Sequence, residues 1–146
     1  MRLVFYTYSY TDRLDQPIPE TLERIARTGY CGIDESSTYG PHLNSDSVTP
    51  ERRKLIRETA KKNKLRVEAI ITHGELTGSL FAGEKLDLKA AVDLAADLGG
   101  DVVTFHLGGP VDGVSPDDVW KKTVAEIKVA ADYGDTRHVR LAIDCG

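Results

Sequence analysis

Short apolar segments alternate with longer amphipathic segments along the whole chain, and this alternation limits the possible folds more than any other feature. Five segments of strand length recur at residues 3–8, 31–34, 65–73, 101–106 and 139–144. Short apolar strands separated by amphipathic helices are typical of parallel sheets whose faces are covered by helices. The sequence therefore predicts an α/β fold with parallel strands.

The four intervening segments carry the end signals of helices. Thr49-Pro50-Glu51 and Ser115-Pro116-Asp117 each combine a hydroxyl cap, a first-turn proline and an acid near the positive helix end. Helical spacing predicts inward-facing residues in each helix: Ile18, Leu22, Ile25 and Ala26; Leu55, Ile56, Thr59 and Ala60; Leu88, Ala91, Val92, Ala95 and Leu98; Trp120, Val124, Ile127 and Ala131.

Two architectures fit this order of elements. The chain has 146 residues, which is the size of a single domain, and we expect one domain over residues 1–146. A five-stranded doubly wound sheet has this size. The first part of an eight-stranded barrel also has this size, since a whole barrel typically needs ~250 residues. Periodicity alone does not choose between the two.

Charge and composition argue against several classes of partner. The net charge is −4, so the surface has no general attraction for phosphate backbones, and we expect no nucleic-acid partner. No apolar run approaches the ~20 residues that span a bilayer, and the first ten residues lack a leader-like pattern. We therefore expect a cytoplasmic protein with no membrane partner. Cys31 and Cys145 show no metal-like or disulfide-like spacing.

Polar residues follow the apolar part of each predicted strand. The carboxyl ends of parallel strands form one edge, where α/β proteins place their chemistry. The residues at that edge are Tyr8, Asp34 with Glu35 beside it, His73, His106 and Asp144. Imidazole and carboxylate groups suit a divalent ion such as zinc, manganese or cobalt, and they equally suit proton transfer at a sugar carbon.

Four segments in order resemble one known superfamily. They are "GYCGIDE", "LRVEAIITHG", "DVVTFHLGG" and "VAADYGDTRHVRLAID". Together they resemble strands two to five of the xylose isomerase-like TIM barrels, which include sugar phosphate isomerases and epimerases and the AP endonuclease family 2 group. The resemblance spans nearly the whole chain. It implies the N-terminal half only: the first five strands and four helices of an incomplete (β/α)8 TIM barrel.

The resemblance also implies a function. Such isomerases and epimerases use a divalent metal (Mn, Co, Mg or Zn) and carboxylates to transfer a proton on a hydroxyketone sugar. Asp144 takes the place of a metal ligand that doubles as acid or base, and His106 is the second catalytic candidate. His73, Asp34 and Tyr8 are the candidates for binding a sugar or polyol substrate. The remaining ligands of the family come from strands six to eight, so we expect an incomplete metal site and impaired activity.

Two departures and two alternatives accompany this interpretation. Asp stands where the family usually has Glu, at Asp34 and at Asp144, which shortens each side chain by about 1.5 Å, a shift that can cost ~100-fold in rate. In an endonuclease IV-like abasic-site nuclease, His73, His106 and Asp144 would be zinc ligands, although the acidic charge opposes this. In a non-catalytic barrel fragment, the same residues would have no catalytic role.

An incomplete barrel has two unpaired edges. The first and fifth strands would each expose backbone hydrogen-bonding groups on one side, and the apolar faces beside them would be partly uncovered. We therefore expect pairing with a second copy or another piece, forming a homo-oligomer through the open barrel edges.

Overall fold

The computed structural model describes residues 2–9, 17–36, 49–84 and 86–144. Its five strands are β1 (Val4–Tyr6), β2 (Gly32–Ser36), β3 (Arg66–Glu75), β4 (Val102–His106) and β5 (Arg140–Asp144). Its helices in these ranges are α1 (Ile18–Arg27), α2 (Pro50–Lys62), α3 (Leu76–Phe81), α4 (Leu88–Leu98) and α5 (Pro116–Arg137).

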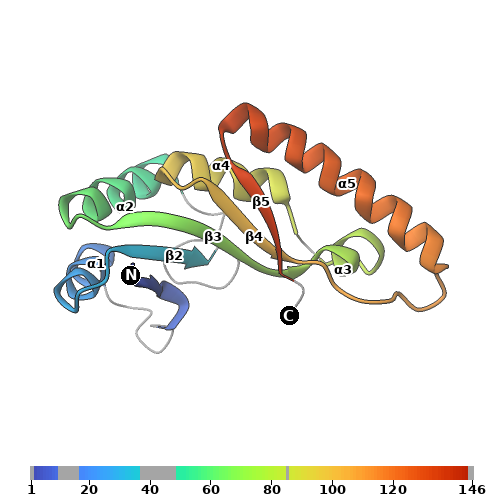
Figure 1. Cartoon of the computed structure of the whole chain (residues 1–146), viewed down its shortest axis with the longest axis horizontal. Helices are drawn as coiled ribbons and strands as arrows, with labels where there is room; N and C mark the ends of the chain where they lie inside the picture. The colour runs from blue at the N-terminus through green and yellow to red at the C-terminus, as the bar shows by residue number, and fades with distance from the viewer. Residues whose placement is uncertain (1, 10–16, 37–48, 85, 145–146) are drawn as a thin grey trace.

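All strand pairs are parallel, and the strand order is β1-β2-β3-β4-β5. A doubly wound sheet reverses its strand order at a switch point, whereas consecutive order is that of a barrel wall. The predicted series of parallel strands from an incomplete barrel is thus confirmed, and the doubly wound alternative is excluded. β1 and β5 lie at the two ends of this open sheet (Figure 1).

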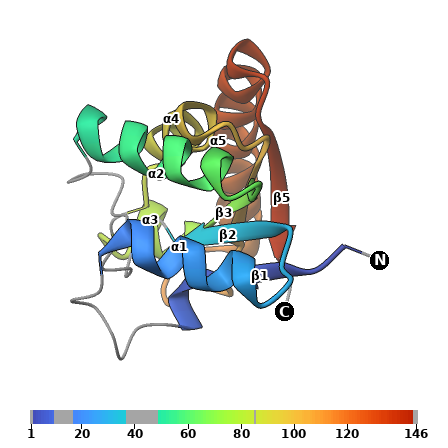
Figure 2. The ribbon, with the colours of Figure 1, turned by 90° about the vertical axis from the view of Figure 1, so that its left-hand side faces the viewer.

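The helices α2, α4 and α5 lie along one side of the sheet (Figure 1), α1 packs beside α2 (Figure 2), and the main core fills the space between the helices and the sheet. Every inward-facing residue predicted for α4 is buried, and Ile56, Thr59 and Ala60 are buried in α2. Leu55 is 44% exposed, so its predicted inward position is wrong. The side of the sheet opposite these helices is called the helix-free face below.

The short helix α3 was not predicted. Residues 74–83 read as a loop in the sequence, whereas β3 continues to Glu75 and α3 follows, making five helices in the described ranges instead of four. α3 has no side-chain cap. Tertiary contacts hold it instead: Leu76 is 1% exposed, and the Thr77 N–H donates to the Leu107 carbonyl at 3.1 Å. Such contacts leave no local signal in the sequence.

The inward-facing stripe predicted for α5 is correct only in part, since Ile127 packs partly buried against the core whereas Trp120 does not. Trp120 is 68% exposed, and the residues that α5 buries are Thr123, Ala130 and Gly134. At 100° per residue, Thr123 lies about 60° around the helix from Trp120. Gly134 leaves room for the turn from α5 into β5, since a Cβ built on Gly134 would lie 2.4 Å from the Val139 carbonyl oxygen.

Within the described ranges, no helix has the length and apolar character needed to cross a membrane.

Candidate functional site

A group of polar and aromatic side chains lies at the carboxyl ends of the strands on the helix-free face. We call it the carboxyl rim and define it by Tyr6, Tyr8, Asp34, His73, His106 and Asp144. Strand register brings its members together, because Tyr6 is the partner of Asp34 and His106 is the partner of Asp144. The residues that alternate with them, Phe5, Ile33 and Phe105, pack in the core on the helix side.

His106 and Asp144 form the accessible end of the rim. The His106 Nδ1 atom lies 3.7 Å from an Asp144 carboxylate oxygen, and both side chains are substantially exposed. This separation is too long for a hydrogen bond, so the attraction is electrostatic and requires a protonated imidazole. The two groups are close enough to act on one small ligand.

His73 lies among aromatic rings at the other end of the rim. Its Nε2 atom shares a hydrogen bond with the Tyr6 hydroxyl, and the Tyr8 ring centroid is 4.8 Å from the His73 ring centroid. Burial lowers the pKa of His73, and the charge on His106 lowers this pKa further. His73 is therefore neutral near pH 7 and available to accept or donate a hydrogen bond.

Asp34 lies beside Tyr6. Burial raises the pKa of Asp34, a hydrogen bond from the Ala69 backbone opposes this, and the Glu68 charge adds to the rise. Burial also raises the pKa of Tyr6, with a smaller upward contribution from Asp34. The structure thus places all five sequence-predicted site residues, Tyr8, Asp34, His73, His106 and Asp144, at the carboxyl ends of adjacent strands. They form two contact groups, one around Tyr6 and His73 and one of His106 with Asp144, and the charge effect of His106 on His73 links the two.

Sequence reasoning missed Tyr6 and did not assign Glu35 a role. Tyr6 lies two residues before Tyr8, and the alternation of side chains in a strand was the available signal for it. The strand β2 was predicted to end at Asp34, but it continues to Ser36. As a result the Glu35 side chain is in the sheet, where it accepts a hydrogen bond from the Thr7 hydroxyl at 2.6 Å and is buried.

The rim does not offer a complete metal site. In the part of the chain that the structure describes, no three His, Cys, Asp or Glu side chains are grouped so as to hold a metal ion. His106 and Asp144 supply two donors, whereas protein metal sites usually take three or four. The described residues therefore do not fit a divalent metal on their own, and the metal at Asp144 stays a prediction.

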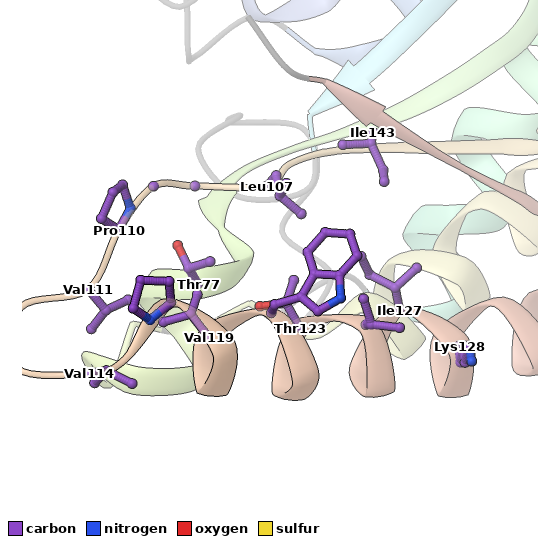
Figure 3. Close-up of a pocket in the computed structure, with 15 residues that line it drawn as sticks. Thr77, Leu107, Pro110, Val111, Val114, Val119, Thr123, Ile127, Lys128 and Ile143 are labelled. Carbon is purple, nitrogen blue, oxygen red and sulfur yellow. The ribbon is translucent and has the colours of Figure 1, made fainter.

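An apolar groove of about 600 Å³ lies on the other side of β5, against α5 (Figure 3). We call it the α5 groove; Leu107, Trp120, Thr123, Ile127 and Ile143 line it together with other, mostly apolar residues. Trp120 is 68% exposed and Ile143 is 45% exposed at this groove. Ile143 precedes Asp144 in β5, and consecutive strand residues point to opposite faces, so the groove is separate from the carboxyl rim.

A parallel sheet in consecutive strand order, with imidazole and carboxylate groups at its carboxyl edge, defines half of an α/β barrel with a rim suited to small polar ligands. The sequence profile of the xylose isomerase-like TIM barrel family matches residues 22–145. The chain belongs to this family and corresponds to the N-terminal half of its barrel, as the sequence segments predicted. A search of curated proteins finds no match.

Solved structures of low sequence identity share the fold. D-psicose 3-epimerase with D-tagatose from Clostridium cellulolyticum H10 is 12% identical, with a TM-score of 0.75, covering 98% of this chain and 52% of that one. L-ribulose 3-epimerase is 22% identical, with a TM-score of 0.66, covering 97% and 48%. A xylose isomerase-like protein from Mycobacterium smegmatis in complex with magnesium is 13% identical, with a TM-score of 0.69, covering 97% and 54%. The chain thus spans about half the length of these structures.

Proposed function

We propose that the carboxyl rim binds a small sugar or polyol and transfers a proton on a hydroxyketone, as in a sugar isomerase or epimerase. The observation that carries this proposal is that the Tyr6–His73 hydrogen bond and the His106–Asp144 pair lie at the carboxyl ends of neighbouring strands on one face of the sheet. The fold shared with D-psicose 3-epimerase and L-ribulose 3-epimerase supports a sugar as the ligand.

Asp144 and His106 are the pair proposed for proton transfer. A carboxylate at Asp144 takes the proton from the carbon next to the substrate carbonyl, and the electrons of that C–H bond form the double bond of an enediolate. A protonated His106 then donates to the enediolate oxygen and stabilises its negative charge. Asp144 can return the proton to the neighbouring carbon while His106 gives its proton to the former carbonyl oxygen and takes the hydroxyl proton from the other oxygen, which gives the isomer. Delivery of a solvent proton to the opposite face of the first carbon, with release of the first proton from Asp144 to solvent, gives the epimer.

The aromatic end of the rim is proposed to hold the sugar. Neutral His73 and the Tyr6 hydroxyl present hydrogen-bonding atoms, and the Tyr8 ring presents an apolar surface for the C–H groups of a sugar. Asp34, beside Tyr6, accepts hydrogen bonds from substrate hydroxyls. A divalent metal at Asp144 would have His106 as its one neighbouring donor among the described residues, so no step above is assigned to a metal.

Binding and proton exchange test this proposal directly. D-tagatose is titrated into the 146-residue protein and followed by NMR, and the exchange of its C3 proton with deuterium is measured with and without manganese. We expect the rim resonances to shift and slow exchange to occur, and we expect His106→Gln or Asp144→Asn to reduce the exchange ~100-fold or more. The matched control is Asp101→Asn at the opposite sheet end. The absence of any rim shift with excess ketose would contradict the proposal.

The open edges of the sheet are proposed to pair with a second copy of the chain. Exposed apolar residues lie at both edges, Leu3 and Val4 beside β1, and Trp120 and Ile143 beside β5. Because one chain spans about half of each matched structure, two copies supply about the length of one. Burial of these residues would stabilise a closed two-fold dimer.

Sedimentation velocity of the wild-type protein and of two variants on α5 tests the pairing. We expect a dimer that dissociates in Trp120→Glu and persists in Val129→Glu, since Val129 is similarly accessible on the same helix but does not line the α5 groove. A monomeric wild-type protein, or a dimer indifferent to Trp120→Glu, would overturn the proposal.

A second candidate function is a non-catalytic half barrel. It is favoured by the small number of possible metal ligands. Among the described residues, His106 and Asp144 lie close together at the accessible end of the rim, and no third His, Cys, Asp or Glu joins them to hold a metal ion. Manganese affinity weaker than millimolar, together with no proton exchange, would support this candidate over the enzyme. The cytoplasmic location stays a prediction from the sequence.

A further inference from the structure

A buried pair of polar side chains lies directly behind the aromatic end of the rim. Glu35 is 2% exposed and Thr7 is 3% exposed, and the Thr7 hydroxyl lies 2.6 Å from a Glu35 carboxylate oxygen. The same hydroxyl lies 3.1 Å from the Asp34 carbonyl oxygen. A buried carboxyl group is costly unless it is hydrogen-bonded, so this arrangement needs a physical explanation beyond packing.

The position of Thr7 suggests what the pair does. Thr7 follows β1 directly and begins a 3₁₀ turn over residues 7–9. Tyr6 and Tyr8 flank it, and both of their rings lie against His73. Because Thr7 is held from behind, on the side away from His73, its hydrogen bond fixes the backbone between the two tyrosines that form the aromatic end of the rim.

The sheet itself gives this turn little support. β1 has only three residues and lies at the edge of the sheet, where its ladder with β2 ends at the Tyr6–Asp34 pair. Tyr8 therefore lies beyond the last ladder partner of β1. The Thr7 hydroxyl donates its one hydrogen to Glu35 and also lies close to the Asp34 carbonyl oxygen, so it extends the connection to β2 by one residue past that point.

We propose that Glu35, acting through Thr7, is a positioning residue that holds Tyr8 against His73. Glu35 does not touch a ligand in the rim, because its side chain lies on the opposite side of β2 from Asp34. The inference rests on the proposed function only in taking the Tyr8–His73 surface as the place where a sugar binds. The ring contact itself is a property of the free protein.

The geometry also accommodates both protonation states of Glu35. Burial raises the pKa of Glu35 to about 7, the Thr7 hydrogen bond opposes this rise, and the Asp34 charge adds to it. A carboxylate and a protonated carboxyl group both keep an oxygen that accepts from Thr7. The amide of glutamine keeps one as well, so Glu35→Gln is a neutral variant that preserves the link.

The decisive variant replaces both partners with apolar residues of similar shape. Thr7→Val combined with Glu35→Leu removes the hydrogen bond without leaving a buried polar group unpaired, and such double replacements are often nearly neutral for stability. The readout is the ring-current shift of the His73 imidazole protons and the Tyr8–His73 cross-peaks in NMR spectra without ligand. We expect the double variant to stay folded and lose both signatures, and Thr7→Ser and Glu35→Gln to keep both.

Thr72→Val is the matched control. Thr72 is fully buried in the neighbouring strand β3, and its hydroxyl is one of two buried side-chain polar atoms without a hydrogen-bond partner in the described residues. We expect this variant to keep the His73 signature and at least the wild-type stability. A double Thr7/Glu35 variant that keeps the wild-type His73 signature would overturn the inference, and so would loss of the signature in Thr72→Val.

A ketose titration separates this inference from the proposed function. If D-tagatose binds the wild-type protein, we expect the double variant to bind it about fivefold more weakly and Glu35→Gln to bind normally. Equal binding by the double variant would contradict a positioning role. If the wild-type protein binds no ketose while the His73 signature still depends on the Thr7–Glu35 pair, the proposed function fails and the positioning inference stands.

Discussion

The two ends of the helix-free face are built from different chemistry. At the amino ends of the strands, Arg2, Arg66 and Arg140 alternate with Glu68 and Asp101 in a belt of ion pairs with distances of 2.5, 3.4, 3.3 and 3.0 Å. At the carboxyl ends, His106 and Asp144 approach only to 3.7 Å, and Tyr6 and Tyr8 lie against His73. The amino end pairs its charges with one another, whereas at the carboxyl end the His106 and Asp144 side chains are 40% and 44% exposed.

This difference also appears in the ionisable groups of the two ends. Burial shifts the pKa values of Tyr6, Asp34, Glu35 and His73, at or directly behind the carboxyl rim, whereas the shifts at Glu51 and Tyr133, on helices, have hydrogen bonds as their first cause. Groups perturbed by burial are enriched at functional sites, and barrel enzymes place stability at the opposite face. Substitutions at the carboxyl end should therefore change how stability or titration depends on pH, whereas substitutions at the amino end should change stability through packing and salt-sensitive ion pairs.

The largest expected effect is a pH-dependent gain of stability in Glu35→Gln. Because burial raises the pKa of Glu35 to about 7 from an ordinary 4.5, the folded wild type holds a proton that the unfolded chain has released. Stability from this group is present in full below pH 4.5 and is lost as the pH rises to 7, by roughly 3 kcal/mol in all. Glutamine does not titrate, so the variant should be more stable than wild type above pH 7.

Urea unfolding at pH 4 and pH 8 measures this difference. At the amino end, Glu68→Gln serves as the comparison, since it loses ion pairs with Arg2 and Arg66 and should be less stable than wild type at pH 8. Equal pH dependence of stability in the wild type and in Glu35→Gln would mean that Glu35 does not titrate differently in the folded and unfolded chains, which would contradict the prediction.

A smaller effect is expected from Gly32→Ala at the amino end. A Cβ at Gly32 would lie 2.9 Å from Glu68 Cγ and 3.2 Å from the Arg66 carbonyl oxygen. Glu68 would have to move, which weakens its ion pairs and costs about 1–2 kcal/mol. Gly109→Ala is the control, because a Cβ there meets nothing within 4 Å. Thermal unfolding of the two variants checks this, and equal stability would mean that the belt tolerates displacement of Glu68.

Removal of the central charge of the belt should have a still smaller, salt-sensitive effect. Arg66→Met leaves both Glu68 and Asp101 with one fewer partner, and partly exposed pairs contribute only about 0.5–1 kcal/mol. The loss should shrink as salt is raised toward 1 M, where screening is strong. Arg27→Met, which removes one exposed pair on α1, should cost less. A salt-independent loss in Arg66→Met would indicate lost packing of the arginine stem instead.

The sequence was sufficient to predict where the candidate residues lie because their signal is local, while their roles stay predictions. Each of His73, His106 and Asp144 follows an apolar segment, and parallel strands bring such positions to one edge whatever the details of packing. The strand order also followed from the family resemblance. The pairing of Thr7 with Glu35 had no such signal, because the two residues are 28 positions apart and meet only through the β1–β2 pairing.

The helix α5 shows that sequence periodicity can find an apolar stripe without showing which of its residues are buried. Periodicity correctly found an apolar stripe, but it assigned Trp120 to the interior although 68% of that residue is exposed. A stripe shows which residues favour burial, and it does not show whether this chain supplies the covering surface. The residues that α5 buries, Thr123, Ala130 and Gly134, have no strong hydrophobic signal, so the periodicity did not point to them.

The smallest expected effect concerns the titration of His73 in protein without added metal. Burial is the first cause that lowers the pKa of His73, and the charge on His106 is the second. His106→Gln should therefore raise the pKa of His73 while leaving it below the ordinary 6.5. With a lowered pKa in the folded state, the unfolded chain binds a proton at His73 before the folded chain does. The contribution of His73 to the stability of the fold is therefore present above pH 6.5 and is lost as the pH falls through the folded pKa. NMR titration of the imidazole protons measures the change, with His138→Gln at the far end of α5 as the control. An unchanged His73 titration in His106→Gln would mean that the two imidazoles do not share one electrostatic environment, and the carboxyl rim would then be two separate groups.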